Sequence, residues 1–388
     1  MKSERIYLDS INHSPLRPAA AAAMTEAMTR CANPSSHHAE GRAAAAAVQK
    51  ARLQVAALIG ARSEEIAFTS SGTESNLWAL SGLAEAHPSK SKHLVVSAVE
   101  HLSILQTVRR MEKRGWSVTV LPVDRTGQVD PDLLEKALTS QTVLVSIQWA
   151  NAEVGTLQRV ADLVRRVKDR GILFHTDAVA AAGQIPIDLR SIPVDALSMA
   201  ANLFGGPPGV GALFLRRGVR IVPLLVGGTQ EEGRRAGTEN LLGIIGMGAA
   251  AESARQELPD SVGRLTSLRD RLIHGILREF PDANLNGHPT DRLPGHVSLS
   301  FPGVDAEALV LVLDREGLAV GLGSACTARA MKASHVLKAM GIEESRALGT
   351  ITCTLTAQTT PAQIDRVLEV LPRAVAQQGT VRPELVEG

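Results

Sequence analysis

Short apolar runs rich in β-branched residues alternate, over roughly the first 250 positions, with longer stretches in which apolar residues recur at helical spacing. This alternation is typical of βαβ units on a mainly parallel sheet, so the predicted fold class is α/β. The expected strands cover 65–69, 93–97, 117–121, 142–147, 172–175, 196–199 and 211–215. The expected helices cover 39–59, two stretches that begin near Thr73 and Ser103, and 160–170.

The pattern changes after an expected helix at 245–256. Strands near 297–301 and 351–355 flank helices near 306–316 and 361–371. Antiparallel strands that share one face with a few helices form α+β units. The C-terminal third therefore predicts a second, smaller α+β domain.

Composition narrows the function classes. The 388 residues, 44% of them hydrophobic, exceed what a single core usually holds. With 41 basic and 40 acidic side chains, the net charge of +1 leaves no global field for nucleic acid, and aromatic residues make up only 3%. No apolar run has membrane length and the N-terminus is not of signal type, so we expect no membrane partner and a cytoplasmic, reducing setting.

Residues that follow each apolar run carry the candidate chemistry, because ligands in open parallel sheets sit beyond the carboxyl ends of the strands. After 66–69 comes Ser70-Ser71-Gly72-Thr73-Glu74-Ser75-Asn76, where small residues open a helix. Free N–H groups at such a helix start suit a phosphate. An N-capping turn with Ser71 or Thr73 as the cap explains the same residues equally well.

Two further strand ends carry titratable groups. Glu100-His101 follows 94–97, and His175-Thr176-Asp177 follows 172–174. A carboxylate directly beyond a buried strand is costly unless paired, so we expect Asp177 to face a cationic partner, with helix capping as the alternative. Both histidines are also compatible with a structural role, and for His175 a core histidine is the preferred interpretation.

The fourth place is the expected glycine-rich loop Gly321-Leu322-Gly323-Ser324-Ala325-Cys326-Thr327, which precedes an expected helix at 332–340. A helix start and the nearby Arg329 and Lys332 would give Cys326 thiolate character, which makes it the best nucleophile candidate. A buried, inert thiol is the alternative. Cys31 and Cys353 are interpreted as structural, and no metal site is predicted.

These segments, taken in order, resemble the cysteine desulfurases, pyridoxal-phosphate (PLP) enzymes of the class V aminotransferase group that remove sulfur from L-cysteine. The matching segments run nearly end to end: Tyr7-Leu8-Asp9 with Pro15, Asn33-Pro34-Ser35-Ser36 with His38 and Gly41-Arg42, Phe68-Thr69-Ser70 with Gly72-Thr73-Glu74-Ser75-Asn76, Glu100-His101, Asn151 with Glu153-Val154-Gly155, His175 with Asp177-Ala178, Gly227-Gly228 with Gln230-Glu231, Gly233 with Arg235-Ala236-Gly237-Thr238, and Gly323-Ser324-Ala325-Cys326.

The resemblance implies a PLP-transferase fold of type I with a large domain over 16–255, a small domain formed by 1–15 and 256–378, and a polar tail at 379–388. The large domain would have a mainly parallel sheet with helices on both faces. The resemblance also implies a homodimer with cofactor sites at the subunit interface.

The same resemblance assigns roles to five positions. Thr73 would bind the cofactor phosphate, His101 would stack on the pyridine ring, and Asp177 would pair with the ring nitrogen. Thr238 would reach the phosphate in the other subunit, and Cys326 would take the sulfur as a persulfide. A carboxylate at the ring nitrogen turns the ring into an electron sink.

Several positions depart from the family pattern. The family's Ser-Gly-His-Lys, whose lysine forms the Schiff base, is Ala200-Ala201-Asn202-Leu203 here, and leucine cannot form an imine. The other departures are Ala152 for an asparagine, Ala180 for a glutamine, Thr352 for the arginine that holds the substrate carboxylate, and Asn12-His13 for an Ala-Thr pair.

These departures favour a desulfurase-like protein with a degenerate PLP site. It would handle sulfur through Cys326, with a sulfur-acceptor or iron–sulfur scaffold protein as partner, and would not desulfurate cysteine. The alternative is an enzyme that binds PLP only non-covalently, or another ligand in the altered pocket. A third hypothesis is pairing with an intact desulfurase to which this chain donates its Thr238 loop.

Overall fold

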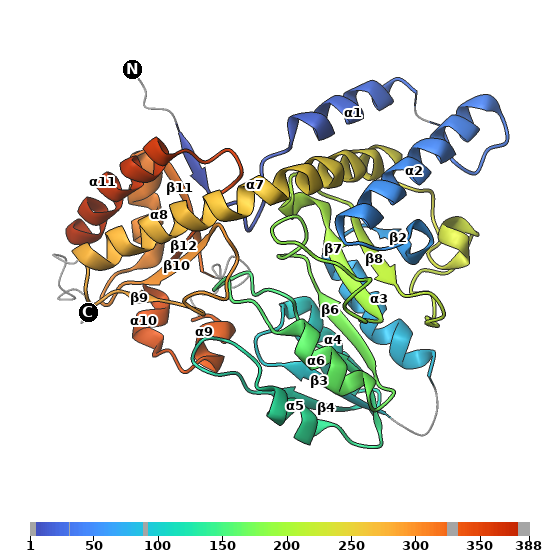
Figure 1. Cartoon of the computed structure of the whole chain (residues 1–388), viewed down its shortest axis with the longest axis horizontal. Coiled ribbons are helices and arrows are strands. Elements are labelled where there is room, and N and C mark those ends of the chain that lie inside the picture. The colour runs from blue at the N-terminus through green and yellow to red at the C-terminus, as the bar shows by residue number, and fades with distance from the viewer. Residues whose placement is uncertain (1–4, 31, 88–91, 324–332, 379–388) are drawn as a thin grey trace, which may run out of the picture.

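The computed structural model describes residues 5–30, 32–87, 92–323 and 333–378. Two sheets organise these residues, one of seven strands and one of five. Helices pack against both (Figure 1).

The larger sheet has the strand order β2-β8-β7-β6-β5-β3-β4. Its strands are β2 (Ile66–Thr69), β3 (His93–Ser97), β4 (Ser117–Leu121), β5 (Thr142–Ser146), β6 (Leu173–Asp177), β7 (Ala196–Ala200) and β8 (Gly211–Leu215). Neighbours from β7 to β4 are parallel, whereas β8 runs antiparallel to β7 and β2. The predicted α/β class with a mainly parallel sheet is confirmed.

Helices cover both faces of this sheet because its strands are apolar on both sides. Leu94 and Val96 share a core with α3 (Gly72–Glu85) and α4 (Leu102–Glu112). Val95, between them, belongs to the opposite core. That second core includes residues of α2 (Ala39–Leu58), α5 (Pro131–Ala137), α6 (Val160–Lys168) and the first half of α7 (Leu241–Glu279), while α1 (Pro18–Met28) packs along α7.

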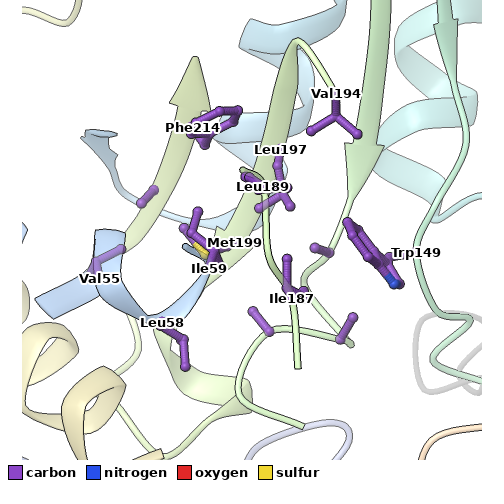
Figure 2. Packing of buried hydrophobic residues seen from close by; sticks show 14 of the residues in the cluster. Val55, Leu58, Ile59, Trp149, Ile187, Leu189, Val194, Leu197, Met199 and Phe214 are labelled. Atoms are coloured by element: carbon purple, nitrogen blue, oxygen red, sulfur yellow. The ribbon is translucent and has the colours of Figure 1, made fainter. Parts of the chain in front are cut away.

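Figure 2 shows part of the second core, where the end of α2 meets the sheet. Val55, Leu58 and Ile59 lie near Met199 of β7, and Trp149 approaches from the end of β5. Ile59 and Met199 are fully buried. This packing fixes the carboxyl end of β7, where the Ala200–Leu203 segment begins.

The smaller sheet has the order β1-β11-β12-β10-β9. Its strands are β1 (Ile6–Leu8), β9 (Asn284–Leu285), β10 (His296–Ser300), β11 (Leu318–Leu322) and β12 (Thr350–Thr354). Only the β1–β11 pair is parallel. The helices α8 (Ala306–Arg315), α11 (Pro361–Gln378) and the second half of α7 complete its core, and the short helices α9 (His335–Ala339) and α10 (Glu344–Leu348) link it to the large sheet through Val99 and Val154.

Helix α7 connects the two sheets and is much longer than the predicted 245–256 segment. It spans 39 residues with Pro259 inside it. Met247 belongs to the core of the large sheet and Leu272 to the core of the small one, so tertiary packing extends the helix past a residue that usually ends one. The predicted domain boundary at 255/256 falls within this helix (Figure 1).

The glycine-rich segment that begins at Gly321 was expected to be a loop, and this expectation is wrong for its first residues. Gly321 and Leu322 belong to β11, which pairs with β12. A Cβ at Gly321 would lie 2.3 Å from Asp9 Oδ1 and 2.5 Å from Thr352 Oγ1, so glycine is needed for the strand to approach its neighbours. The expected helix at 332–340 is shorter, since α9 begins at His335, and its predicted start at Lys332 lies outside the described residues.

No helix in the described part of the chain is long and apolar enough to cross a membrane.

Candidate functional site

A cavity of about 310 Å³ lies at the carboxyl ends of the parallel strands. Its walls come from residues that follow β3, β5, β6 and β7, from the start of α3, and from β11, α9 and β12 of the smaller sheet. Ligand pockets in proteins commonly have this size and lie at this end of a sheet. Strands of both sheets therefore enclose a single candidate site.

Three of the predicted site residues, Thr73, His101 and Asp177, line this cavity. Thr238 does not. It lines a separate cavity of about 140 Å³ together with Ser70 and Gly209. Cys326 lies outside the described residues.

Asp177, the last residue of β6, is held by two neutral donors. Asn76 Nδ2 donates to its Oδ2 at 2.6 Å, and the backbone N–H of Val179 donates to its Oδ1 at 2.9 Å. Burial raises the pKa of Asp177, and attraction by the nearby His101 opposes this rise. We expected Asp177 to face a cation, but no lysine or arginine among the described residues pairs with it. The side-chain amide of Asn76 lies next to its carboxyl group instead.

His101 is the N-cap of α4, and its Nδ1 accepts from the backbone N–H of Ser103 at 3.1 Å. His175 has a different environment. Its two ring nitrogens lie 2.8 Å from Ser146 Oγ and 2.9 Å from Ser198 Oγ, and burial lowers its pKa to about 3. The interpretation of His175 as a neutral core histidine is confirmed.

The start of α3 has the capping turn that the sequence left open as an alternative to phosphate binding. Ser71 is the N-cap, and its Oγ accepts from the backbone N–H of Glu74 at 3.2 Å. Gly72 and Thr73, the next two residues, line the cavity. Glu74 accepts from the backbone N–H of Ser70 at 2.7 Å and pairs with Arg235 at 2.9 Å, so one carboxylate already lies at this helix start.

Two more carboxyl groups line the cavity, Glu100, which the sequence placed at a strand end without giving it a role, and Glu153, which it noted only within a matching segment. Glu100 is fully buried. Its Oε1 accepts from Ser97 Oγ at 2.5 Å and from the backbone N–H of Gln148 at 2.9 Å, while its Oε2 has no partner. Burial raises the pKa of Glu100 to about 8 and that of the half-buried Glu153 to about 7. The signal available in the sequence was their place in the segments that follow β3 and β5.

The opposite wall is apolar or neutral. Ala200 ends β7, and the following single turn, Ala201–Leu203, places the side chain of Leu203 on the cavity, 7% exposed. Five other positions that depart from the family pattern also line the cavity, namely Asn12, Ala152, Ala180, Asn202 and Thr352, whereas His13 and Ala201 do not. No lysine or arginine lines the cavity in the described part of the chain.

The fold is that of the PLP-dependent transferases of fold type I. Residues 6–367 match the family model for class V aminotransferases, and the chain belongs to this family.

Within this family, its relatives are cysteine desulfurases. It is 42% identical to the cysteine desulfurase IscS of Methanosarcina thermophila over 98% of this chain and 95% of that protein. It is 44% identical to the cysteine desulfurase IscS of Dictyoglomus turgidum, over 99% and 97% of the two chains. Among solved structures, a NifS-like protein superposes with a TM-score of 0.90 at 34% identity, covering 96% of this chain and 100% of that one.

The family implies PLP as cofactor, and the residues of this cavity fit that group only in part. Asp177 and His101, to which the resemblance gives roles at the pyridine ring, both line the cavity, and the start of α3 offers N–H groups to an anion. A covalent anchor requires a primary amine, and the described lining has none. The described cavity therefore does not fit a covalently held PLP.

Proposed function

We propose that this chain is a cysteine desulfurase-like protein with a degenerate PLP site, which handles sulfur without removing it from cysteine. The observation that supports this proposal most strongly is Leu203. It lies on the wall of the cavity at the position where the resemblance places the Schiff-base lysine. Thr352, on the side of the small sheet, offers a hydroxyl group where the resemblance expects the arginine that holds the substrate carboxylate.

In this proposal Cys326 carries the sulfur. Its thiolate attacks the outer sulfur of a persulfide donor, the S–S bond of the donor breaks, and the donor leaves as a thiol while Cys326 becomes the persulfide. Cys353 is no competitor. It is buried in β12, and burial raises its pKa to about 12, which agrees with its predicted structural role.

The partners in this proposal are a second copy of the chain and a sulfur-acceptor or iron–sulfur scaffold protein. The relatives named IscS, a class of sulfur-mobilising enzyme, support a role in sulfur transfer. The homodimer would bring Thr238 to the site of the other subunit, which agrees with its position outside the cavity of its own chain. The proposal also includes a cytoplasmic location and the division into domains 16–255 and 1–15 with 256–378.

Sulfur handling is tested by incubating the full chain with a low-molecular-weight persulfide and locating the added sulfur by mass spectrometry. We expect persulfide on Cys326, its loss in Cys326→Ser, and no sulfide release from L-cysteine by either protein. A mass-tagged alkylating reagent provides the second test. Labelling of Cys326 no faster than Cys353 in the native protein would contradict the role of Cys326.

A second candidate function is ligand binding or catalysis with PLP held non-covalently, or with a different ligand. The cavity supports this second candidate function. Its volume of about 310 Å³ remains open, and Asp177 and His101 still line it. Equilibrium dialysis of the full chain against PLP, followed by denaturation in acid, tests this candidate, because a non-covalent ligand is released unmodified.

A further inference from the structure

The titratable groups that face the cavity are mainly acidic. Glu100 follows β3, Glu153 follows β5 and Asp177 ends β6. The basic groups are two imidazoles, His101 at the start of α4 and His335 at the start of α9. No lysine or arginine of the described residues lines the cavity, so its described wall offers no permanent positive charge.

Two of the three carboxyl groups are placed to receive a donor from a ligand. Glu153 is half-buried, its Oε2 accepts from Ser334 Oγ, and its Oε1 has no hydrogen bond to any described residue. Asp177 is 6% exposed and receives a single donor on each oxygen, although a carboxylate oxygen accepts two. Ala180, Ala200 and Leu203 also line the cavity and provide an apolar surface for the body of a ligand.

The lining of the same cavity is less suited to binding a phosphate group. The start of α3 provides N–H groups, but Ala200 adds no donor, and the carboxylate of Glu74 already lies at this helix end. Arg235, the nearest described guanidinium there, is paired with Glu74. Burying a doubly charged anion without a cation is strongly unfavourable.

The protonation states of the carboxyl groups give this site a defined pH dependence. Burial raises the pKa of Glu153 to about 7 and that of Glu100 to about 8, and it also raises the pKa of Asp177. A bound cation stabilises the ionised carboxylates, so its binding releases protons and strengthens as pH rises. One group with a pKa near 7 gives an increase of about tenfold in affinity from pH 6 to pH 8.

We infer that the cavity binds a small organic cation without a phosphate group, with its protonated nitrogen against Asp177 and Glu153 and its apolar body against Leu203. The inference rests on the proposed loss of the covalent PLP anchor and names the ligand class of the second candidate function. It also explains why a cavity persists when the groups for cysteine chemistry have been replaced.

Two matched pairs of probes test the inference on the full chain by isothermal titration calorimetry. Benzylamine and benzoate have similar bodies and opposite charge, and pyridoxamine and pyridoxamine 5′-phosphate differ only in the phosphate. We expect benzylamine to bind at least tenfold more tightly than benzoate, and pyridoxamine more tightly than its phosphate. Benzylamine affinity should increase about tenfold from pH 6 to pH 8, with protons released to the buffer.

Glu153→Gln is the discriminating variant, because it keeps the shape of a half-buried side chain and removes its charge. We expect it to weaken benzylamine binding about tenfold and to reduce the pH dependence, whereas Glu307→Gln, an exposed carboxylate on α8, changes neither. Tighter binding of benzoate or of the phosphorylated probe, or no binding of benzylamine at millimolar concentration, would overturn the inference. A PLP–lysine adduct would instead overturn the proposed function, so the two failures are distinguishable.

Discussion

The two walls of the cavity differ in what their side chains do for the protein. On the wall formed by β6 and α3, the buried Asn76 donates to Asp177 and also to the half-buried Ser103 behind it. On the wall formed by the end of β7, Ala200 and Leu203 make no side-chain hydrogen bonds, and Asn202 has none to a described residue. Side-chain hydrogen bonds therefore stabilise the first wall, whereas the side chains of the second wall make none to a described residue.

This difference teaches which part of such a site a fold can lose. A buried carboxyl group such as Asp177 destabilises the protein when its donors are removed, so its neighbours are constrained by stability. A lysine or serine that contacts only a cofactor has no such constraint, and its replacement by leucine or alanine leaves the strand and turn intact.

Among substitutions near the first wall, we expect Glu100→Gln to change the free energy of unfolding most. Its pKa in the folded protein is about 8, against an ordinary value of 4.5. The folded state thus binds the proton more tightly, and the stabilisation present below pH 4.5 is lost as pH rises towards 8. Glu100→Gln cannot ionise, so its free energy of unfolding should decline less over pH 5 to 8, by up to roughly 4 kcal/mol.

Urea denaturation of both proteins at several pH values checks this prediction. The exposed control Glu307→Gln should keep the slope of the original chain. Parallel pH profiles for Glu100→Gln and the original chain would mean that Glu100 is ionised in the folded protein.

The next prediction compares the same substitution on the two walls. Asn76→Ala removes the donor of Asp177 at 2.6 Å and should lower the free energy of unfolding by about 2 kcal/mol. Asn202→Ala, in the same cavity, removes a side chain without a hydrogen bond to any described residue and should change it by about 0.5 kcal/mol or less. Chemical denaturation measures both. Equal losses would show that the walls do not differ in the way described.

The sequence predicted much of this architecture, because the large sheet has strongly periodic, buried strands. The strands from β2 to β8 and the meeting of Thr73, His101 and Asp177 at one end of the sheet followed from the order of apolar runs. Several elements were not predicted, among them three that show why. β1 is only three residues long, β11 contains a glycine that its packing requires, and α7 continues past Pro259 because it packs on both sheets.

The candidate site was less accessible to sequence reasoning than the fold. Glu100 and Glu153 acquire their properties from burial, which a sequence does not display. Thr238 lines a different cavity from Thr73, His101 and Asp177. Only a second subunit would bring it to a site of that kind. The burial of the two glutamates and the location of Thr238 both depend on how segments far apart in the chain pack together, which the sequence alone does not display.

We expect the smallest effect from restoring the lysine at a single position of the second wall. Leu203→Lys should not give measurable sulfide release from L-cysteine, because Ala200 and Thr352 still leave the phosphate and the substrate carboxylate poorly held. Residues that act as a unit are not additive. A sulfide assay on this variant, with the original chain as background, measures the effect. Turnover at the level of an ordinary desulfurase would show that the other replacements are harmless.

The central claim, that the PLP site no longer holds its cofactor covalently, is tested most directly by the absorption spectrum of the full chain purified from cells that contain PLP. Borohydride treatment and peptide mass spectrometry then report any imine as a stable adduct. The account predicts no internal-aldimine band and no lysine that carries a reduced PLP group. An aldimine band that borohydride converts into a PLP adduct on any lysine of this chain would contradict it.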